Sequence, residues 1–477
     1  MTATASCAPL APDLCVIGAG AGGLAVAAGA AQMGASVVLI ERGEMGGDCL
    51  NFGCVPSKAL LAAAKLAHDW RKGAEHGIDY AAPLIDFAGV ADSVARVIRR
   101  IAPNDSVERF AGLGVTVMRG EARFVDPRRV AVDGTEIRAR RFVVATGSTP
   151  AVPPIPGLDS VPYFTNETIF AHRAALRHLV VIGGGAVGIE LAQAHRRLGA
   201  AITVIDAGPL LPRDDPELVA LLAERLATEG IGLHPMSPIA RIAPDGDGVA
   251  VTLASGARIA GSHLLIAAGR RPNLAALDLP AAGIAATERG ITVDARLRTG
   301  NRRVFAIGDV AGGPQFTHVA LQHAGIVIRN ALFRLPARVD YSALPWVTYS
   351  DPELAQVGMS EATARDAYGD RIRVLRWDFA ENDRAYTERD TAGRVKIVTR
   401  GNGRILGATI LVAQAGEQIA PWALAISRRL KIGALANLVL PYPTRGEAGK
   451  RAAASFYTPT LFSLRTRRLV RLLAHFG

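Results

Sequence analysis

Two glycine-rich loops constrain the fold of this chain more than any other feature of its sequence. The first loop follows the apolar run Leu14–Ile17 and contains Gly18, Gly20 and Gly23 in the spacing G-x-G-x-x-G. Between a strand and a helix, the first such glycine permits a tight turn, the second lets a pyrophosphate approach the backbone, and the third packs helix against strand. A second β-branched run then stops at Glu41, where a carboxylate can accept hydrogen bonds from a ribose hydroxyl. We therefore predict a dinucleotide-binding fold here.

The same arrangement recurs after Leu179–Ile182. The second set of glycines is Gly183, Gly185 and Gly188, and Asp206 closes the strand that follows. Two such folds in one chain predict two cofactors. An acid at the end of the second strand favours NADH, because a 2′-phosphate would favour arginine there. Arg213 lies close by in the sequence, so NADPH remains the alternative.

The segment from Leu14 to Ile40 carries no charge and is long enough to span a bilayer. Its glycine cluster, alanine-rich middle and second β-branched run instead indicate strand, turn, helix and strand. No basic region precedes it, so we do not expect a signal peptide.

Composition narrows the class of protein. The chain has 477 residues and a formal charge of +11, but lysine is scarce and no basic block alternates with aromatic residues, so nucleic-acid binding is not expected. Four cysteines cannot crosslink a chain of this length, which favours a reducing, cytoplasmic location. In that compartment the close pair Cys49 and Cys54 is catalytic or metal-binding more often than structural.

The C-terminal stretch TLFSLRTRRLVRLLAHFG mixes arginine with leucine and contains no acid. It can form a basic amphipathic helix on an anionic membrane surface. We prefer the simpler interpretation, a terminal helix packed on its own domain.

Further motifs fall between and after the two loops. They are VVATGS, AAGRRPN, VFAIGDVAG, YSDPELAQVG and GRILGATIL. With the cysteine pair and both glycine loops, this series resembles the FAD-dependent pyridine nucleotide-disulfide oxidoreductases, among them dihydrolipoamide dehydrogenase, glutathione reductase and mercuric reductase. The resemblance runs from about Asp13 to Tyr457. It implies an α/β fold class with two Rossmann-like dinucleotide-binding domains, for FAD and NAD(P), and a C-terminal α+β dimerisation domain.

The resemblance also implies domain boundaries and cofactor contacts. The FAD domain would comprise 1–151 and 273–343, the NAD(P) domain 152–272, and the interface domain of a homodimer 344–477. Gly18, Gly20, Gly23 and Glu41 would hold the adenosine-pyrophosphate half of FAD, and Asp309 its ribityl chain. The remaining cofactor-binding residues expected from the motifs are Thr146, Gly147, Gly183, Gly185, Gly188, Asp206, Gly269 and Gly308.

By analogy, Cys49 and Cys54 form the redox-active disulfide, with Cys54 against the flavin and Cys49 exchanging with the substrate. Cys54 precedes Val55-Pro56, and proline is favoured in a first helical turn, so Cys54 should lie near a helix N-terminus, which lowers a thiol pKa. A structural zinc site needs four ligands and no second cysteine pair exists, so no metal site is expected. Lys58 would lie near the flavin and pair with Glu190.

The family's disulfide reductases end in His-Pro-Thr-x-x-Glu, whereas this chain reads YPTRGE, with Tyr442 in the histidine position and Glu447 retained. An unperturbed tyrosine, with a pKa of about 10, is a poor base near neutral pH. Tyr442 therefore makes lipoamide or glutathione disulfide doubtful and resembles mercuric reductase, although no cysteine pair follows Cys54.

Three functions follow from these residues. The first is a mercuric reductase-like enzyme that reduces a metal ion, a small disulfide or a quinone-like acceptor. The second is a dihydrolipoyl dehydrogenase. The third is a non-catalytic flavoprotein that acts as a binding module, which the intact cysteines and glycine loops disfavour.

Overall fold

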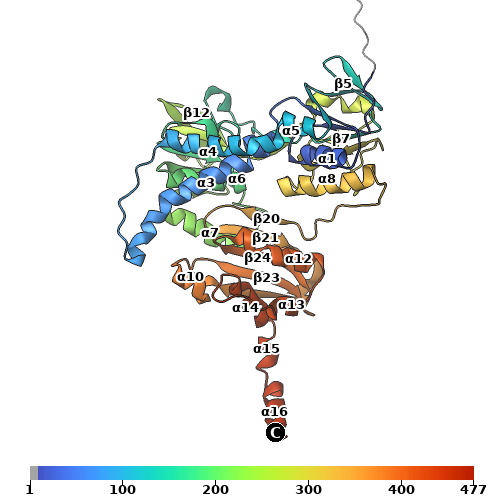
Figure 1. The fold of residues 1–477 in the computed structure, drawn as a ribbon. Coiled ribbons are helices and arrows are strands. Elements are labelled where there is room, and N and C mark those ends of the chain that lie inside the picture. Colours follow the sequence, from blue (N-terminus) through green and yellow to red (C-terminus); the bar gives the residue numbers. More distant parts are fainter. Residues whose placement is uncertain (1–8, 477) are drawn as a thin grey trace, which may run out of the picture. The chain divides into compact units, whose positions relative to one another are not determined.

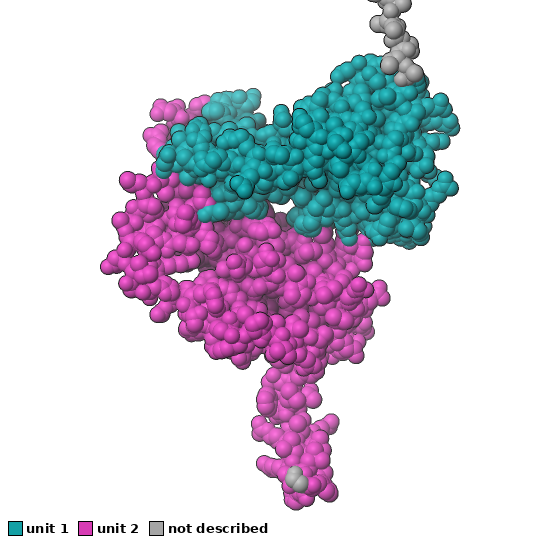
Figure 2. All heavy atoms as spheres, in the orientation of Figure 1, with its two compact units in different colours: residues 1–62, 86–175, 263–339 teal, residues 63–85, 176–262, 340–477 magenta. Residues whose placement is uncertain are grey.

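The computed structural model describes residues 9–476 and divides into two compact units, coloured separately in Figure 2. Unit 1 comprises Met1–Ala62, Asp86–Ala175 and His263–Val339. Unit 2 comprises Ala63–Ile85, Leu176–Ser262 and Asp340–Gly477. The predicted α/β fold class is confirmed. The finer division of the chain into three domains stays a prediction.

A parallel sheet forms the centre of unit 1. Its strand order is β19-β7-β1-β2-β3. The bounds are β1 Leu14–Ile17, β2 Val37–Glu41, β3 Val115–Arg119, β7 Arg141–Val144 and β19 Val304–Ala306. All four residues of β1 are buried, because both faces of the sheet are covered.

Alternate residues of β1 enter two different cores. Leu14 and Val16 pack with side chains of the helices α1 (Ala21–Gln32) and α8 (Thr317–Ala331), which Figure 1 shows running alongside each other. Cys15 and Ile17 pack on the other face, against the antiparallel sheet β4-β5-β6. These strands are Arg123–Asp126, Arg129–Val132 and Thr135–Ile137. The period-two pattern of a strand explains the split.

The rest of unit 1 is mainly helical. These helices are α2 Gly47–Asn51, the first part of α3 Cys54–Asp69, α4 Phe87–Ile101 and α5 Val107–Gly112. A small ribbon pairs β8 (Ser148–Pro150) with β16 (Arg270–Pro272).

Unit 2 repeats the strand–helix–strand pattern. Parallel strands lie in the order β11-β10-β9, followed along the chain by the antiparallel sheet β12-β13-β14. The bounds are β9 His178–Ile182, α6 Ala186–Arg197, β10 Ala201–Ile205, α7 Pro216–Thr228, β11 Ile231–His234, β12 Ile239–Asp245, β13 Gly248–Leu253 and β14 Arg258–Gly261.

The C-terminal part of unit 2 is an antiparallel sheet of order β20-β21-β24-β23-β22 with helices packed on it. The strands are β20 Pro345–Thr348, β21 Glu353–Gly358, β22 Ile372–Asp378, β23 Arg394–Arg400 and β24 Ile405–Val412. The helices are α9 Glu361–Tyr368, α10 Asp383–Thr387, α11 Ala415–Gln418, α12 Ala420–Ser427, α13 Gly433–Ala436 and α14 Glu447–Ser455. Every residue of β24 is buried, which makes this strand the centre of the core.

Two short helices end the chain, α15 (Thr458–Leu461) and α16 (Leu464–Leu473). Neither contains a buried residue. The preferred interpretation of this stretch as a helix packed on its own domain is therefore wrong. The uncharged segment near the N-terminus forms β1, α1 and β2 as expected, and no helix within residues 9–476 has the length and apolarity to cross a bilayer.

Candidate active site

The three glycines of the first loop serve different geometric purposes. Gly18 has φ +105°, and a Cβ there would lie 2.4 Å from the carbonyl oxygen of Ala145. A Cβ on Gly23 would lie 1.9 Å from the carbonyl oxygen of Gly18, so the helix can approach the strand only without a side chain. A Cβ on Gly20 would meet nothing within 4 Å. The loop is therefore closed at its first and third glycines and open at its second, which suits an approaching pyrophosphate.

Glu41 holds this loop through both carboxylate oxygens. Its Oε2 accepts a hydrogen bond from the backbone N–H of Ala19 at 2.5 Å, and its Oε1 accepts one from Gly43 at 2.6 Å. Each carboxylate oxygen can accept more than one hydrogen bond, so a ribose hydroxyl can still bind.

The second loop reproduces the first. Gly183 has φ +118°, and a Cβ on Gly188 would lie 1.9 Å from the carbonyl oxygen of Gly183. Gly185 precedes α6, and a Cβ there would meet nothing within 4 Å. Asp206 accepts hydrogen bonds from the backbone N–H groups of Gly184 at 2.6 Å and Gly208 at 2.7 Å. The two predicted dinucleotide loops thus share one backbone geometry.

The cysteine segment is pressed against the first glycine loop. The N–H of Gly46 donates to the carbonyl oxygen of Ala19 at 3.0 Å. A Cβ on Gly47 would lie 2.8 Å from the Cα of Gly20, so only glycine permits this approach. Helix α2 then carries Cys49, and α3 begins at Cys54.

The two thiols are free and hydrogen-bonded to each other. The hydrogen bond from Cys49, then the Thr317 hydroxyl and the charge of Lys58, lower the pKa of the Cys54 thiol to about 6 against the opposing effect of burial. Its Sγ lies 3.4 Å from Thr317 Oγ1. The same hydrogen bond and burial raise the pKa of Cys49. At neutral pH the pair therefore holds one thiolate, on Cys54, and one thiol.

Lys58 lies one helical turn after Cys54 on α3, where its positive charge lowers the Cys54 pKa. Its predicted partner Glu190 belongs to unit 2. There Glu190 is buried, with 5% exposure, and its Oε1 accepts the backbone N–H of Tyr349 at 2.9 Å. The Lys58–Glu190 ion pair stays a prediction.

Asp309 lies in a polar cluster that the sequence patterns did not reveal. Its Oδ2 accepts the Ser148 hydroxyl at 2.5 Å, and burial raises its pKa. Arg270 contacts this serine through Nε at 2.7 Å and forms an ion pair of 3.0 Å with Asp48, the neighbour of Cys49. One arginine thus connects the predicted ribityl contact with the cysteine helix. Only its place inside the motif AAGRRPN could have indicated this role.

Thr146 and Gly147 meet the chain that returns from unit 2. Thr146 Oγ1 donates to the Asn273 carbonyl oxygen at 2.8 Å, and the Asn273 side chain donates to the Thr146 carbonyl oxygen at 2.9 Å. Three further turns depend on glycine, because Gly147, Gly269 and Gly308 have φ values of +66°, +125° and +66°. Gly308 N–H donates to Nδ1 of buried His323 at 3.1 Å, and burial lowers the pKa of this histidine to about 4.

Tyr442 is exposed, with 68% of its surface accessible. Its hydroxyl donates to Asp383 Oδ2 at 2.7 Å, and this hydrogen bond raises the tyrosine pKa above its ordinary value. Glu447 lies nearby in sequence as the first residue of α14. A tyrosine with a raised pKa is a still poorer base near neutral pH.

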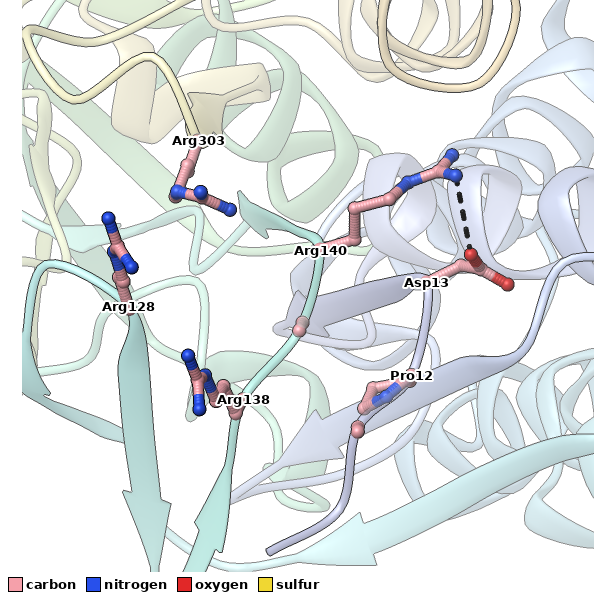
Figure 3. A pocket seen from close by; sticks show the side chains of 8 residues that line it. Pro12, Asp13, Arg128, Arg138, Arg140 and Arg303 are labelled. Atoms are coloured by element: carbon pink, nitrogen blue, oxygen red, sulfur yellow. Dashed lines mark ion pairs between the residues drawn. The ribbon is translucent and has the colours of Figure 1, made fainter.

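A separate hollow of about 260 Å³ lies at the amino-terminal ends of the parallel strands of unit 1 (Figure 3). The first glycine loop lies at the other, carboxyl ends of these strands. Its lining includes Asp13, which forms a 3.6 Å ion pair with Arg140. The other arginines that line it are Arg128, Arg138 and Arg303. Asp13, Arg140 and Arg303 directly precede β1, β7 and β19. Ligands of parallel α/β sheets bind at the carboxyl ends of the strands, so this hollow is not part of the predicted redox site.

Two glycine loops built for dinucleotides, with a thiol pair pressed against the first, define a flavin- and nicotinamide-dependent oxidoreductase. Residues 12–324 match the family model "Pyridine nucleotide-disulphide oxidoreductase", and residues 344–453 match the dimerisation domain of that family. The chain belongs to the pyridine nucleotide-disulphide oxidoreductases.

Similar proteins agree with this assignment. The chain is 38% identical to a mercuric reductase of Streptomyces lividans, covering 93% of this chain and 96% of that protein. It is 36% identical to a dihydrolipoyl dehydrogenase of Geobacillus stearothermophilus, covering 92% and 94%. The structure of the Cu(II) complex of the HOCl-induced flavoprotein disulfide reductase RclA from Escherichia coli matches with a TM-score of 0.84 at 29% identity, covering 92% and 98%. The chain is thus an FAD-dependent NAD(P)H disulfide oxidoreductase with mercuric reductase-like sequence.

Proposed function

We propose that this enzyme uses NADH to reduce a thiophilic metal ion, with Hg(II) as the test substrate, through the Cys49–Cys54 pair. The observation that carries the proposal is the Cys54 thiolate, stabilised by Cys49 and Thr317 and located beside the first glycine loop. Overall, NADH and Hg(II) would give NAD⁺, a proton and elemental mercury. A small disulfide or a quinone-like oxidant is the other acceptor class.

Residues of unit 1 would hold FAD. Gly18, Gly20, Gly23 and Glu41 would bind the adenosine-pyrophosphate half, and Asp309 the ribityl chain. The open space above Gly20 supports this fit, because a pyrophosphate needs a backbone without a side chain. FAD, when bound, accepts a hydride from reduced nicotinamide and supplies its electrons to the cysteine pair.

The two cysteines would divide the chemistry between them. Cys54 is a thiolate above about pH 6, and the charge of Lys58 helps to stabilise this thiolate. Cys49 keeps its proton until an acceptor arrives and then provides the second sulfur. Two thiolates are a suitable ligand pair for a soft metal ion, and reduction of that ion requires no general base at Tyr442.

A second candidate, dihydrolipoyl dehydrogenase, is favoured by the similarity to the Geobacillus stearothermophilus enzyme. Its reaction exchanges protons as well as electrons, for which a base near neutral pH is useful. The raised pKa of Tyr442 counts against this candidate.

The decisive comparison is steady-state NADH oxidation with Hg(II) plus excess thiol in one reaction and lipoamide in another. The proposal predicts fast turnover with Hg(II) and turnover at least about a hundredfold slower with lipoamide, given the contribution of a positioned base. Fast turnover with lipoamide alone would establish the second candidate. If neither supports turnover while NADH still bleaches the flavin, the metal-ion proposal is wrong and quinones are tested next.

For the cofactor, we propose NADH over NADPH because Asp206 directly follows β10 and contacts the second glycine loop. Asp206→Arg should shift the ratio of kcat/KM values toward NADPH, because a guanidinium can bind the 2′-phosphate. Asp206→Asn is the control, because it removes the carboxylate that accepts the two backbone hydrogen bonds without introducing a guanidinium. An unchanged ratio in Asp206→Arg would contradict the ribose assignment.

For assembly and location, we propose a homodimer in a reducing compartment such as the cytoplasm. The matched dimerisation domain supports the first point. The cysteine count supports the second, because four cysteines cannot crosslink a chain of 477 residues.

A further inference from the structure

Helix α16 exposes its apolar side chains to solvent. Figure 1 shows α15 and α16 running outward from the β-sheet of the same unit. Leu469 is 53% exposed, Leu473 56% and Phe476 81%. Apolar side chains exposed together in one segment mark an interaction surface.

One face of the helix carries no arginine. Thr466, Leu469, Val470 and Leu473 follow the spacing i, i+3, i+4, i+7 and therefore share one face. The rest of the helix surface carries the four arginines together with Leu464 and Leu472, and Arg467 and Arg471 are one turn apart. Ser463 caps the helix, since its hydroxyl accepts the N–H of Thr466 at 3.2 Å.

The charge of this segment is entirely positive. The sequence has no aspartate or glutamate after Glu447, and α16 carries Arg465, Arg467, Arg468 and Arg471. None of these four arginines forms an ion pair with another residue in the range 9–476. Like charges one turn apart disfavour a helix in water, so an anionic surface would stabilise this one.

We infer that α16 binds the surface of an anionic lipid bilayer, with Leu469, Val470 and Leu473 toward the acyl chains and the arginines at the headgroups. A second copy of the chain fits less well. Its formal charge is +11, and a symmetric contact of α16 with itself would bring arginines against arginines. The helix lies on the bilayer and does not cross it, because it is too short.

Vesicle flotation tests this inference. The holoenzyme is mixed with vesicles of phosphatidylcholine alone, or of phosphatidylcholine with an equal part of phosphatidylglycerol. We expect binding to the second kind only, and weaker binding at high salt. Failure to bind phosphatidylglycerol vesicles at low salt would overturn the inference.

Matched variants separate this helix from the general positive charge. Arg467→Gln with Arg471→Gln should weaken binding by about thirtyfold, as two lost lipid-facing charges imply. Arg99→Gln with Arg100→Gln removes the same charge from exposed positions of α4 and should leave binding unchanged. If both double variants lost vesicle binding to the same extent, non-specific attraction by the positive charge of the chain would explain the binding, and the inference would be overturned.

Two further variants test the apolar face and the competing occupant. Leu469→Gln with Leu473→Gln should abolish binding while every charge remains. Deletion of 461–477 should abolish binding and leave both the dimer and NADH-dependent flavin bleaching intact. A truncated protein that becomes monomeric would instead assign α16 to contact with a second copy. None of these outcomes depends on the acceptor, so they remain distinct from a failure of the proposed function.

Discussion

The two glycine loops have the same backbone but lead into different chemistry. In each, the acid at the end of the second strand accepts the N–H that follows the first glycine, from Ala19 in unit 1 and from Gly184 in unit 2. The carbonyl oxygens of these two residues also accept hydrogen bonds from the chain that follows the acid. Gly46 donates its N–H to Ala19, and Leu211 donates its N–H to Gly184.

The difference begins at these last two residues. After Gly46 the chain enters α2 and α3, which carry the cysteine pair, whereas after Leu211 it continues to Asp215, which caps α7. The glycines and acids therefore determine how a dinucleotide loop is built. What the loop does is determined by the segment packed beside it, which predicts a redox site at the first repeat and a binding site at the second.

The largest expected effect comes from filling the helix–strand contact of each loop. Gly23→Ala should yield protein without flavin, because the added Cβ overlaps the Gly18 carbonyl and overpacking costs about 1–3 kcal/mol or more. Gly188→Ala should retain flavin and raise the KM for NADH by at least about tenfold. Flavin absorbance per protein and steady-state kinetics measure both.

Gly112→Ala is the control, because a Cβ there meets nothing within 4 Å and the residue ends helix α5. Loss of flavin from Gly188→Ala, with full flavin in Gly23→Ala, would reverse the assignment of the two loops.

Two substitutions beside the cysteines should shift the Cys54 pKa in opposite directions. Thr317→Val removes a hydrogen bond to the thiolate and should raise the Cys54 pKa. Asp48→Asn removes a carboxylate that repels the thiolate and should lower the Cys54 pKa. The rate of alkylation of the reduced enzyme as a function of pH should show a midpoint of about 6 in the unaltered protein. Shifts in the same direction would contradict this account.

The same pKa shift has a consequence for stability. The folded pKa of Cys54 lies below the value of an unfolded thiol, about 8.5. Its contribution to the free energy of unfolding is therefore fully present above the unfolded pKa and is lost as pH falls through about 6. Cys54→Ser should remove this part of the pH dependence in urea unfolding, and an unchanged profile would argue against a thiolate.

The smallest effect is expected at Tyr442. Its raised pKa keeps the hydroxyl protonated near neutral pH, so Tyr442→Phe should change turnover with Hg(II) by less than about twofold. Tyr442→His restores the family's usual residue and should raise lipoamide turnover. A large loss in Tyr442→Phe would show that the hydroxyl takes part in the reaction.

The first glycine loop was predictable because its signals are local. Leu14–Ile17 is β1 as predicted, and the alanine-rich segment and the β-branched run are α1 and β2. The start of α3 at Cys54 also followed from a local signal, the nearby proline. Each of these predictions uses a few adjacent residues whose backbone preferences agree.

The contacts around Cys54 were not predictable from spacing. Thr317 is far away in the sequence and reaches the thiol only because α8 packs beside α1. Arg270 approaches Asp48 in the same way, through the fold of unit 1. The packing of the last helix was predicted wrongly, because an amphipathic pattern reveals an apolar face but not what covers it.

The central claim is that electrons stored in the Cys49–Cys54 pair are part of the enzyme's reducing capacity. Anaerobic titration of the oxidised enzyme and of Cys49→Ala with NADH tests it directly, with flavin absorbance and remaining thiols followed together. We predict that the unaltered enzyme consumes twice as much NADH per flavin as the variant, and that the additional reduction appears as free thiols. Equal consumption by both proteins, with no new thiols, would contradict the claim.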